Sequence, residues 1–479
     1  MRKWFLLLLA VAPSHAATNA ILFVTQVPMP TEINASEVTS SVANVASPFS
    51  NHLGDTVACG RGGALWIRYG NGTLSNLTLL AGYGTTNQSQ TGANAIAVRE
   101  PSVHWSGTKA LFSMVVGAPT GPGDTNRHVW QVYEVTNFAA PVISYVTNQP
   151  ATYNNVSPTY GSNGRIIFAS DRPRDGSPHL YPQREEYLLL PTVTGLWSLN
   201  PNTGDLFLLE HSPSGSFRPF VDSFGRVLFT RWDHLSRDVR QVTDKQGQST
   251  NTLFNYSDES ASALVTTNTT ELFPEVRPSD KEAQDGTIRG NAFNIFLPWQ
   301  INEDGTAQEV VNHVGRHELL GQVPSSTFTN NPDIVTLVSN RNQIANFFVN
   351  SEDPSTPGLL YGVDAIDIGT HTAGQIVSLN SATNINPDAM VLNYVTPKST
   401  AFTNSFGVYR NPVMLSNGVL IAAYSRATNF ATNIGTPLAP KSAYNFRLMT
   451  VVGGTTNSYL TPGLAGTYTY WSGSNQVTY

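Results

Sequence analysis

Four stretches of this chain share one pattern, in which a proline is followed six residues later by a glycine and then by an apolar run. They read PSVHWSGTKALFSM (101–114), PTYGSNGRIIFAS (158–170), PFVDSFGRVLFTR (219–231) and PVMLSNGVLIAAY (412–424). The first three copies begin 57 and 61 residues apart (158 − 101 and 219 − 158). Self-similarity at a nearly constant spacing indicates a repeat architecture, so this pattern decides the fold class.

Each copy predicts two antiparallel strands joined by a tight turn. The proline begins the first strand, where its missing N–H does least harm, and the glycine lies in the turn, where a positive φ is easily adopted. A second hairpin, of two apolar runs around a short polar turn, follows each copy. The six candidates for this second hairpin are 64–78, 129–146, 195–210, 294–311, 358–379 and 444–460. Two hairpins make a four-stranded sheet, so the chain predicts an all-β, six-bladed β-propeller, with seven blades as the alternative.

The ends of the chain suggest how the ring closes. The run AILFV (20–24) resembles the strand that follows each repeat glycine, but no first strand precedes it. The C-terminal segment TYTYWSGSNQVTY (467–479) resembles SVHWSGTKALFSM, and we expect it to supply that missing strand. Such sharing would leave no free sheet edge. The fifth first hairpin does not show the motif and is expected within 325–350.

The predicted strand order separates short turns from long connections. With the strands of a blade lettered A to D from the centre outward, the A–B and C–D turns are short and share one face. The long connections on the other face include 80–100, 114–128, 170–194, 231–292 and 312–330. Long loops on a rigid scaffold commonly carry function, so we expect a binding site on that face, over the central funnel. Residues 235–292 read as a loop-like insertion rather than as sheet.

The N-terminus has the features of a secretory signal peptide. Arg2 and Lys3 supply positive charge, residues 4–12 are apolar, and residues 14–17 are small enough for cleavage, apart from one histidine. We expect residues 1–17 to be removed and residues 18–479 to form a single propeller domain in the periplasm or outside the cell. No later segment is long and apolar enough for a membrane span.

Composition restricts the partners and cofactors. The 479 residues carry a net charge of −6, and only 13% of them are charged, which argues against nucleic acid as a partner. Cys59 is the only cysteine, so the chain contains no CxxCH sequence and no covalently attached c-type haem is expected. No cofactor is predicted, although a divalent metal is compatible with the histidine pair described below.

Several stretches resemble a known group of propellers. The chain resembles exported TolB-like β-propellers, and more closely the propeller-containing middle domain of the hydrazine synthase alpha subunit and its uncharacterised relatives. The matching stretches are RGGALWIRYGNG (61–72), REPSVHWSGTKALFSM (99–114), GRIIFASDRP (164–173), GRVLFTRWDH (225–234) and NHVGRHEL (312–319). The resemblance implies a propeller fold and an exported location. It supplies no catalytic residue, because the haem chemistry of the synthase belongs to CxxCH segments that this chain lacks.

Five arginines are expected near the long-loop rim of the funnel. Three precede the A strands and two follow B strands; they are Arg99, Arg218 and Arg410, and Arg172 and Arg231. Converging guanidinium groups could bind a carboxylate or a phosphate in a bidentate manner. Alternatively, each arginine pairs with a neighbouring carboxylate, such as Glu100, Asp171 or Asp233, and holds a loop in place.

Two histidine-containing segments are candidate sites. Asp233 and His234 follow a B strand, and a histidine beside a carboxylate can act as a general base or bind a metal, or can simply satisfy a buried loop. His313 and His317, with Arg316 between them, would face the same way only on a helix, and they are weak metal candidates.

These features allow three functions. The leading hypothesis is a non-catalytic exported propeller that binds a protein partner or a small ligand through its long-loop funnel face. The alternative is a hydrolase or lyase in the funnel, with Asp233 and His234 as acid–base groups and the arginines as an anion clamp. A third is a redox partner that holds non-covalent haem or copper through His313 and His317. Fold alone does not decide among them.

Overall fold

The computed structural model describes most of the repeat units. The described residues are 19–26, 61–86, 92–118, 128–172, 195–210, 215–234, 294–312, 344, 346–365, 373–387, 390–398, 406–426, 446–462, 464, 469–472 and 475–478. Almost all regular structure in them is β-strand, and the single short α-helix, α1, spans Leu77–Leu80. Within these residues, no helix is both long and apolar enough to span a membrane.

Three separate four-stranded antiparallel sheets occupy the middle of the chain. The first contains β4 (Ile96–Val103), β5 (Lys109–Val116), β6 (Gln131–Thr136) and β7 (Val142–Tyr145). The second contains β8 (Asn155–Tyr160), β9 (Ile166–Ser170), β10 (Gly195–Leu199) and β11 (Leu206–Glu210). The third contains β12 (Gly215–Val221), β13 (Arg226–His234), β14 (Asn294–Asn302) and β15 (Glu309–Val310).

The remaining strands form sheets of other sizes. An eight-stranded sheet contains β16 (Phe347–Glu352), β17 (Leu359–Ala365), β18 (Gly374–Asn380), β19 (Leu392–Tyr394), β20 (Val408–Met414), β21 (Leu420–Ser425), β22 (Arg447–Val452) and β23 (Thr455–Tyr459). Its two halves, β16–β19 and β20–β23, are joined through one residue pair, Gly374 with Tyr409. A three-stranded sheet contains β1 (Ile21–Thr25), β2 (Ala64–Arg68) and β3 (Leu74–Asn76), and a two-stranded one contains β24 (Thr469–Ser472) and β25 (Asn475–Thr478).

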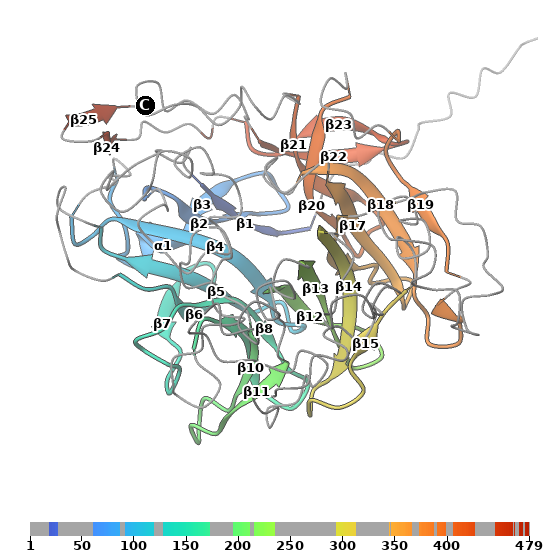
Figure 1. Cartoon of the computed structure of the whole chain (residues 1–479). Coiled ribbons are helices and arrows are strands. Elements are labelled where there is room, and N and C mark those ends of the chain that lie inside the picture. The colour runs from blue at the N-terminus through green and yellow to red at the C-terminus, as the bar shows by residue number, and fades with distance from the viewer. Residues whose placement is uncertain are drawn as a thin grey trace, which may run out of the picture.

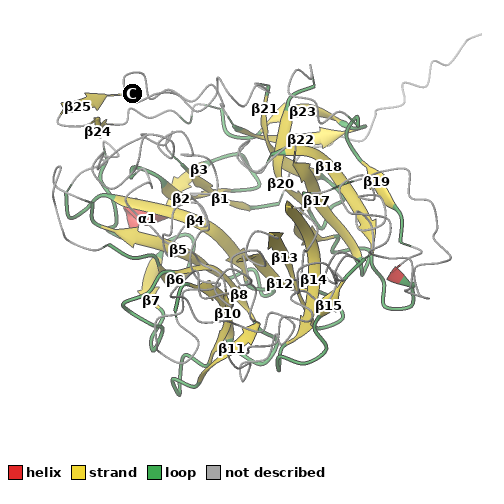
Figure 2. Ribbon diagram, in the orientation of Figure 1, coloured by secondary structure: helices red, strands yellow, loops and turns green. Residues whose placement is uncertain are grey.

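The sheets have a propeller-like arrangement. The first strands of successive units lie toward the middle of the molecule, and β4 contacts β8, β8 contacts β12, β12 contacts β16 and β16 contacts β20. The last strands, β7, β11, β15, β19 and β23, lie at the periphery (Figures 1 and 2). Each unit thus runs from the centre outward along the chain, as expected for a propeller.

Apolar packing, rather than a shared strand, joins the three-stranded sheet β1–β3 to the unit β20–β23. Ile21 on β1 packs with Val419, Ile421 and Leu460. The guanidinium Nε of Arg68 donates to the Leu460 carbonyl at 2.8 Å, across 392 residues of sequence. The expectation that 467–479 adds a strand to the sheet β1–β3 is wrong, because in the described residues β24 and β25 pair only with each other. The side chains of β1 are buried or half-buried without such a strand.

Five of the six expected second hairpins are confirmed, and the sixth has the wrong place in its unit. Residues 64–78, 129–146, 195–210, 294–311 and 444–460 contain the paired third and fourth strands of their units, or the last two of the three-stranded sheet. Residues 358–379 instead supply β17 and β18, which are the second and third strands of their unit. Its first strand is β16, at the end of the 325–350 stretch, and its fourth is β19.

The repeat glycines have the predicted role in the A–B turns. Gly107, Gly164, Gly225 and Gly418 have φ between 70° and 81°, which side chains with a Cβ adopt only with strain. Each donates its N–H to the carbonyl three residues earlier, which closes a tight turn.

The number of blades differs from the simple expectation. The described residues show three separate four-stranded sheets, one continuous eight-stranded sheet, a three-stranded sheet and a two-stranded sheet, rather than six or seven separate four-stranded blades. The coarse expectation of an all-β, propeller-like fold is confirmed.

A repeated bulge distorts the first strand of four units. The residue directly before the repeat proline has φ of 52–53° in each case; these residues are Glu100, Ser157, Arg218 and Asn411. The pairing register with the second strand shifts at the same place. A bulge inserts an extra residue and redirects its side chain, and a left-handed residue other than glycine costs roughly 1–3 kcal/mol.

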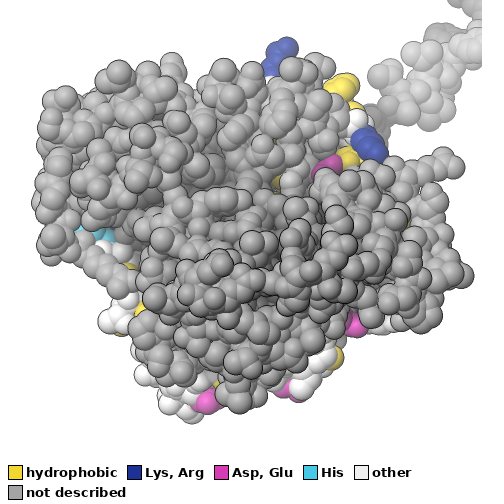
Figure 3. Space-filling model, in the orientation of Figure 1, with side chains coloured by type: hydrophobic (Ala, Val, Ile, Leu, Met, Phe, Trp, Pro, Cys, Tyr) yellow, Lys and Arg dark blue, Asp and Glu magenta, His cyan; other side chains and the backbone are white. Residues whose placement is uncertain are grey.

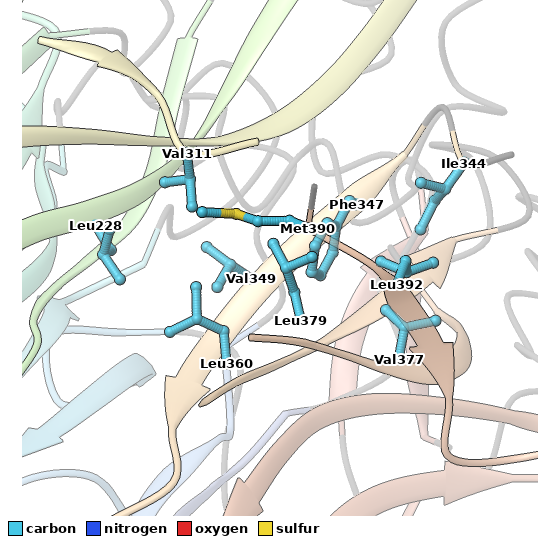
Figure 4. Packing of buried hydrophobic residues seen from close by; sticks show 10 residues of the cluster. All are labelled: Leu228, Val311, Ile344, Phe347, Val349, Leu360, Val377, Leu379, Met390 and Leu392. Carbon is cyan, nitrogen blue, oxygen red and sulfur yellow. The ribbon is translucent and has the colours of Figure 1, made fainter. Parts of the chain in front are cut away.

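The interface between the third sheet and the eight-stranded sheet is a compact apolar core. Leu228 on β13 and Val311 meet Phe347, Leu360 and Leu379, together with their neighbours (Figure 4). Phe347, Leu360 and Leu379 are fully buried. Packing of this kind holds neighbouring blades together, because in the described residues only one isolated bridge, between Phe296 and Asn346, pairs these two sheets.

Truncation of this core is expected to weaken the fold. Leu379→Ala leaves a cavity and lowers the free energy of unfolding by about 2–5 kcal/mol. Val391→Ala, at a 46% exposed position of the same unit, is the matched control and changes it by less than about 0.5 kcal/mol. Denaturant unfolding followed by circular dichroism measures both, and equal effects would contradict the packing described here.

Candidate functional site

The bulges bring polar side chains from neighbouring first strands together near the axis. We call this group the axial cluster; its members are Arg99, Glu100, Ser157, Arg218, Asn350 and Arg410. They come from five consecutive first strands, β4, β8, β12, β16 and β20. The cluster therefore depends on the ring arrangement and not on any single sheet.

Glu100 is the centre of the axial cluster. Its carboxylate accepts from Arg99 through both oxygens at 3.0 Å, which is the bidentate geometry of a strong ion pair. The Ser157 hydroxyl donates to it at 2.6 Å, and the Arg218 Nε lies 3.9 Å from the same carboxylate. One carboxylate thus links three first strands.

The charges around Glu100 decide its protonation. Burial raises the pKa of Glu100. The charges of Arg99 and Arg218 and the hydrogen bonds from Ser157 and Arg99 lower this pKa, and together they outweigh the effect of burial. Its pKa therefore lies below the ordinary 4.5. Glu100 is ionised at neutral pH and neutralises one of the nearby guanidinium groups.

Arg218 connects the cluster to the next strand around the axis. Its Nη1 donates to the Asn350 side-chain carbonyl at 2.9 Å, while its Nε faces Glu100. Burial and the charge of Arg99 lower the pKa of Arg218, and Glu100 opposes this effect. Arg218 shares with Arg99 a single carboxylate, so that carboxylate compensates the two charges only in part.

Arg410 has no carboxylate partner among the described residues. Its guanidinium lies 5.6 Å from the centre of the Phe446 ring. Burial and the charge of Arg218 lower the pKa of Arg410 to about 9, with Glu100 acting in the opposite direction and Arg99 adding to the effect. The Nε of Arg410 and the Nη1 of Arg99 are buried without a hydrogen-bond partner in the described part of the chain. Buried N–H groups of this kind call for an acceptor.

The other two predicted arginines lie over tryptophans. The Arg172 guanidinium lies 4.5 Å from the centre of the Trp197 ring, and that of Arg231, which is fully buried, lies 4.3 Å from the Trp299 ring. Both arrangements are cation–π contacts with a third strand. The structure thus brings Arg99, Arg218 and Arg410 together, and gives Arg172 and Arg231 aromatic partners.

The described residues include only part of the two histidine-containing segments. Asp233 and His234 end β13, where their backbones pair with Ile295 and Asn294, but their side chains lie outside the described residues. His313, Arg316 and His317 lie entirely outside them, as does the insertion 235–292. Among the described residues, no group of three or more His, Cys, Asp or Glu side chains could hold a metal ion.

Sequence reasoning found the arginines of the axial cluster and named Glu100 as a pairing partner, which the Arg99–Glu100 ion pair confirms, but it missed Ser157, Asn350 and the link from Glu100 to neighbouring strands. Glu100, Ser157 and Arg218 each occupy the position directly before a repeat proline, and Asn411 occupies the same position in the last unit. Comparison of that position across the four repeats was the signal that could have identified Glu100 and Ser157. Nothing in the repeat pattern indicated Asn350, because its unit lacks the proline.

Comparisons with known proteins concern architecture. No protein-family profile matches the sequence, and no curated protein sequence matches it. Among solved structures, hydrazine synthase from Kuenenia stuttgartiensis is similar over 92% of this chain and 45% of its own, at 12% identity and a TM-score of 0.49. A prolyl endopeptidase is similar over 85% of this chain and 41% of its own, at 9% identity and a TM-score of 0.34. An oligogalacturonate lyase solved with manganese is similar over 82% of this chain and 69% of its own, at 11% identity and a TM-score of 0.33.

These comparisons agree with the expected resemblance and add no chemistry. The chain folds as a propeller-like all-β structure, and hydrazine synthase is among the solved structures similar to it. The chain spans less than half the length of the hydrazine synthase and prolyl endopeptidase chains that it matches.

The axial ion pair predicts a dependence of stability on pH. The pKa of Glu100 is depressed in the folded protein, so the unfolded chain binds more protons in acid. The stability contributed by Glu100 is therefore present at neutral pH and is lost as the pH falls below about 4.5. Glu100→Gln is expected to lower the free energy of unfolding at pH 7 by about 3 kcal/mol, because it leaves two arginines without their carboxylate.

Denaturant unfolding at pH 7 and pH 3.5 measures both effects. The difference between wild type and Glu100→Gln should be smaller at the lower pH. Asp205→Asn is the matched control: Asp205 pairs with Arg165 at 2.6 Å but its side chain is 64% exposed, so the loss should stay below about 1 kcal/mol. Equal losses in the two variants would refute the axial role of Glu100.

Proposed function

We propose that this chain is an exported, six-bladed β-propeller that binds a small anionic ligand, such as a carboxylate or a phosphate, at its axial cluster. The proposal rests on positive charge at the axis that no second carboxylate among the described residues compensates. Three arginines, Arg99, Arg218 and Arg410, interact electrostatically with one carboxylate, that of Glu100. The sum of these charges is +2 (3 − 1).

An anion would resolve two unfavourable features at once. It would accept from the orphaned N–H groups of Arg410 and Arg99, which have no acceptor among the described residues. It would also offset the mutual repulsion and burial that depress the pKa of Arg410. Arginine suits this role because its planar guanidinium presents several donors that match carboxylate and phosphate geometry.

The net charge of the chain does not account for the binding of an anion. On the face drawn in Figure 3, the described Lys and Arg side chains form small separate areas at the edge. The overall charge of the chain is −6. Attraction of anions is thus expected at the axis, where the arginines converge, and not from the net charge of the chain.

The blade count of six is part of the proposal. It counts β1–β3 as one blade and divides the eight-stranded sheet at the single pair Gly374–Tyr409. Apolar clusters join neighbouring units, and the Ile21 cluster joins the last unit to the first. The units β8–β11 and β12–β15 are in contact through β8 and β12. Removal of a signal peptide at residues 1–17, export, and a single domain over 18–479 are proposals carried by the sequence features of the N-terminus and the repeats.

Replacement of Arg410 is expected to separate binding from folding. Arg410→Met keeps the aliphatic stem but removes a charge that folding disfavours, as the lowered pKa indicates. The ligand-free variant should therefore be as stable as wild type or more stable. It should lose the rise in melting temperature that phosphate or succinate gives to wild type at constant ionic strength, which we expect to correspond to a tenfold or greater loss of affinity, or at least about 1.4 kcal/mol.

Arg447→Met is the matched control for this experiment. Arg447 also faces an aromatic ring, that of Tyr459 at 6.0 Å, but it lies on β22 near the periphery. Its replacement removes the same charge and should leave the anion effect unchanged. Thermal unfolding followed by fluorescence measures all three proteins. An anion effect that is absent from wild type, or unchanged in Arg410→Met, would reject the proposed function.

A further inference from the structure

An aromatic platform stands on the short-turn face, in the turn between β4 and β5. Trp105 is 69% exposed, although it is the largest side chain in that turn. Single exposed apolar residues are common and need no explanation by themselves. Trp105 differs from them because other rings hold it in place, as described next.

Stacked rings fix the orientation of Trp105. The His104 ring lies 3.8 Å from the Trp105 ring, centre to centre, at an interplanar angle of 34°. Tyr160, from the end of β8 in the neighbouring sheet, meets both rings edge-on, at 4.7 Å from His104 and 6.3 Å from Trp105. The indole is thus part of an ordered three-ring assembly from two sheets. An ordered ring binds a partner with little loss of side-chain entropy.

Hydrogen-bonding groups surround the rings. The His104 Nδ1 accepts from the Ser106 backbone N–H at 3.1 Å, which places the ring proton of the neutral imidazole on Nε2. The Ser106 hydroxyl bridges His104 and Thr108 at 2.8 Å on each side. All of these groups belong to the exposed turn or directly precede it. They offer donors and acceptors beside an apolar ring face.

The platform has no net charge. Lys109 pairs with Glu134 at 2.8 Å, and the Tyr160 hydroxyl donates to the same carboxylate at 2.9 Å. Burial and the nearby Lys109 lower the pKa of His104, so the imidazole is neutral at pH 7. A charged ligand would therefore gain little here, in contrast to the axial cluster.

We infer that this platform, His104–Trp105–Tyr160 with the hydroxyls of Ser106 and Thr108, binds a neutral sugar ring. A pyranose presents an apolar face of C–H groups that stacks on an indole, and a rim of hydroxyls that matches the donors and acceptors around it. Proline-rich peptides instead use grooves lined by aromatic side chains, and other extended peptides add a strand to a sheet edge. In the described residues of this turn, Trp105 is the only strongly exposed aromatic ring.

Affinity electrophoresis tests this inference in native gels that contain hydroxyethylcellulose, xyloglucan or galactomannan. Wild type should be retarded by at least one of these neutral polysaccharides. Trp105→Ala should weaken the retardation about tenfold or more, and Trp105→Phe should keep part of it. Phe224→Ala is the matched control: Phe224 is 41% exposed in the corresponding turn between β12 and β13, but Arg226 lies over its ring at 5.2 Å. This control should migrate like wild type.

Two kinds of result would overturn the inference. One is a wild type that none of the three polysaccharides retards, or a Trp105→Ala variant that is retarded as strongly as wild type. The other is self-association of wild type, seen by analytical ultracentrifugation and lost in Trp105→Ala, which would make the platform an interface between copies of the chain. Trp105 is exposed, so its replacement should leave circular dichroism unchanged.

Discussion

The bulge before the repeat proline is the constraint on which the centre of this molecule depends. Proline disfavours ordinary helical angles in the residue before it, and here that residue adopts a left-handed conformation in four first strands. The resulting shift of register redirects one side chain in each strand. Where those side chains are Glu100, Ser157 and Arg218, they meet across three sheets. Local strain in the backbone is thus balanced by contacts between neighbouring sheets.

The electrostatics of the axis follow from which residue occupies each bulge. A single carboxylate, Glu100, pairs with Arg99 and lies near Arg218. Arg99 is buried and the other two side chains are partly buried, which makes this arrangement sensitive to any further charge. Arg410 adds that charge without a carboxylate of its own among the described residues. A cluster built only for stability would be expected to balance its charges, since buried unpaired charge is costly. The excess positive charge among the described residues is the reason that we propose an anionic ligand.

The sequence was sufficient to predict the features that are local. The repeat spacing, the turn glycines and most hairpins depend on residues close in sequence, and the structure confirms them. The assignments that failed depend on distant partners: 358–379 was given the wrong place in its unit, and 467–479 was expected to pair with β1. Strand pairing between ends of a chain is decided by packing that a single sequence does not display, as the contact of Ile21 with Val419 and Leu460 illustrates.

The sequence predicted the arginines of the candidate site but not the contacts that join its strands. The three axial arginines stood out by their place before the A strands, but Glu100 was considered only as a neighbour of Arg99. Its contacts with Ser157 and Arg218 join residues 57 and 118 positions away (157 − 100 and 218 − 100), which only the ring brings together. Asn350 lies in the unit whose proline motif is missing, so no pattern in the sequence marked it.

An experimental structure of the protein in the presence of selenate, phased on the selenium signal, tests the central claim most directly. The account predicts one anomalous peak at the axis within hydrogen-bond distance of Arg410 and close to Arg218, with the Arg99–Glu100 pair intact. A map without a peak there, in which a carboxylate of the chain itself forms an ion pair with Arg410, would contradict it.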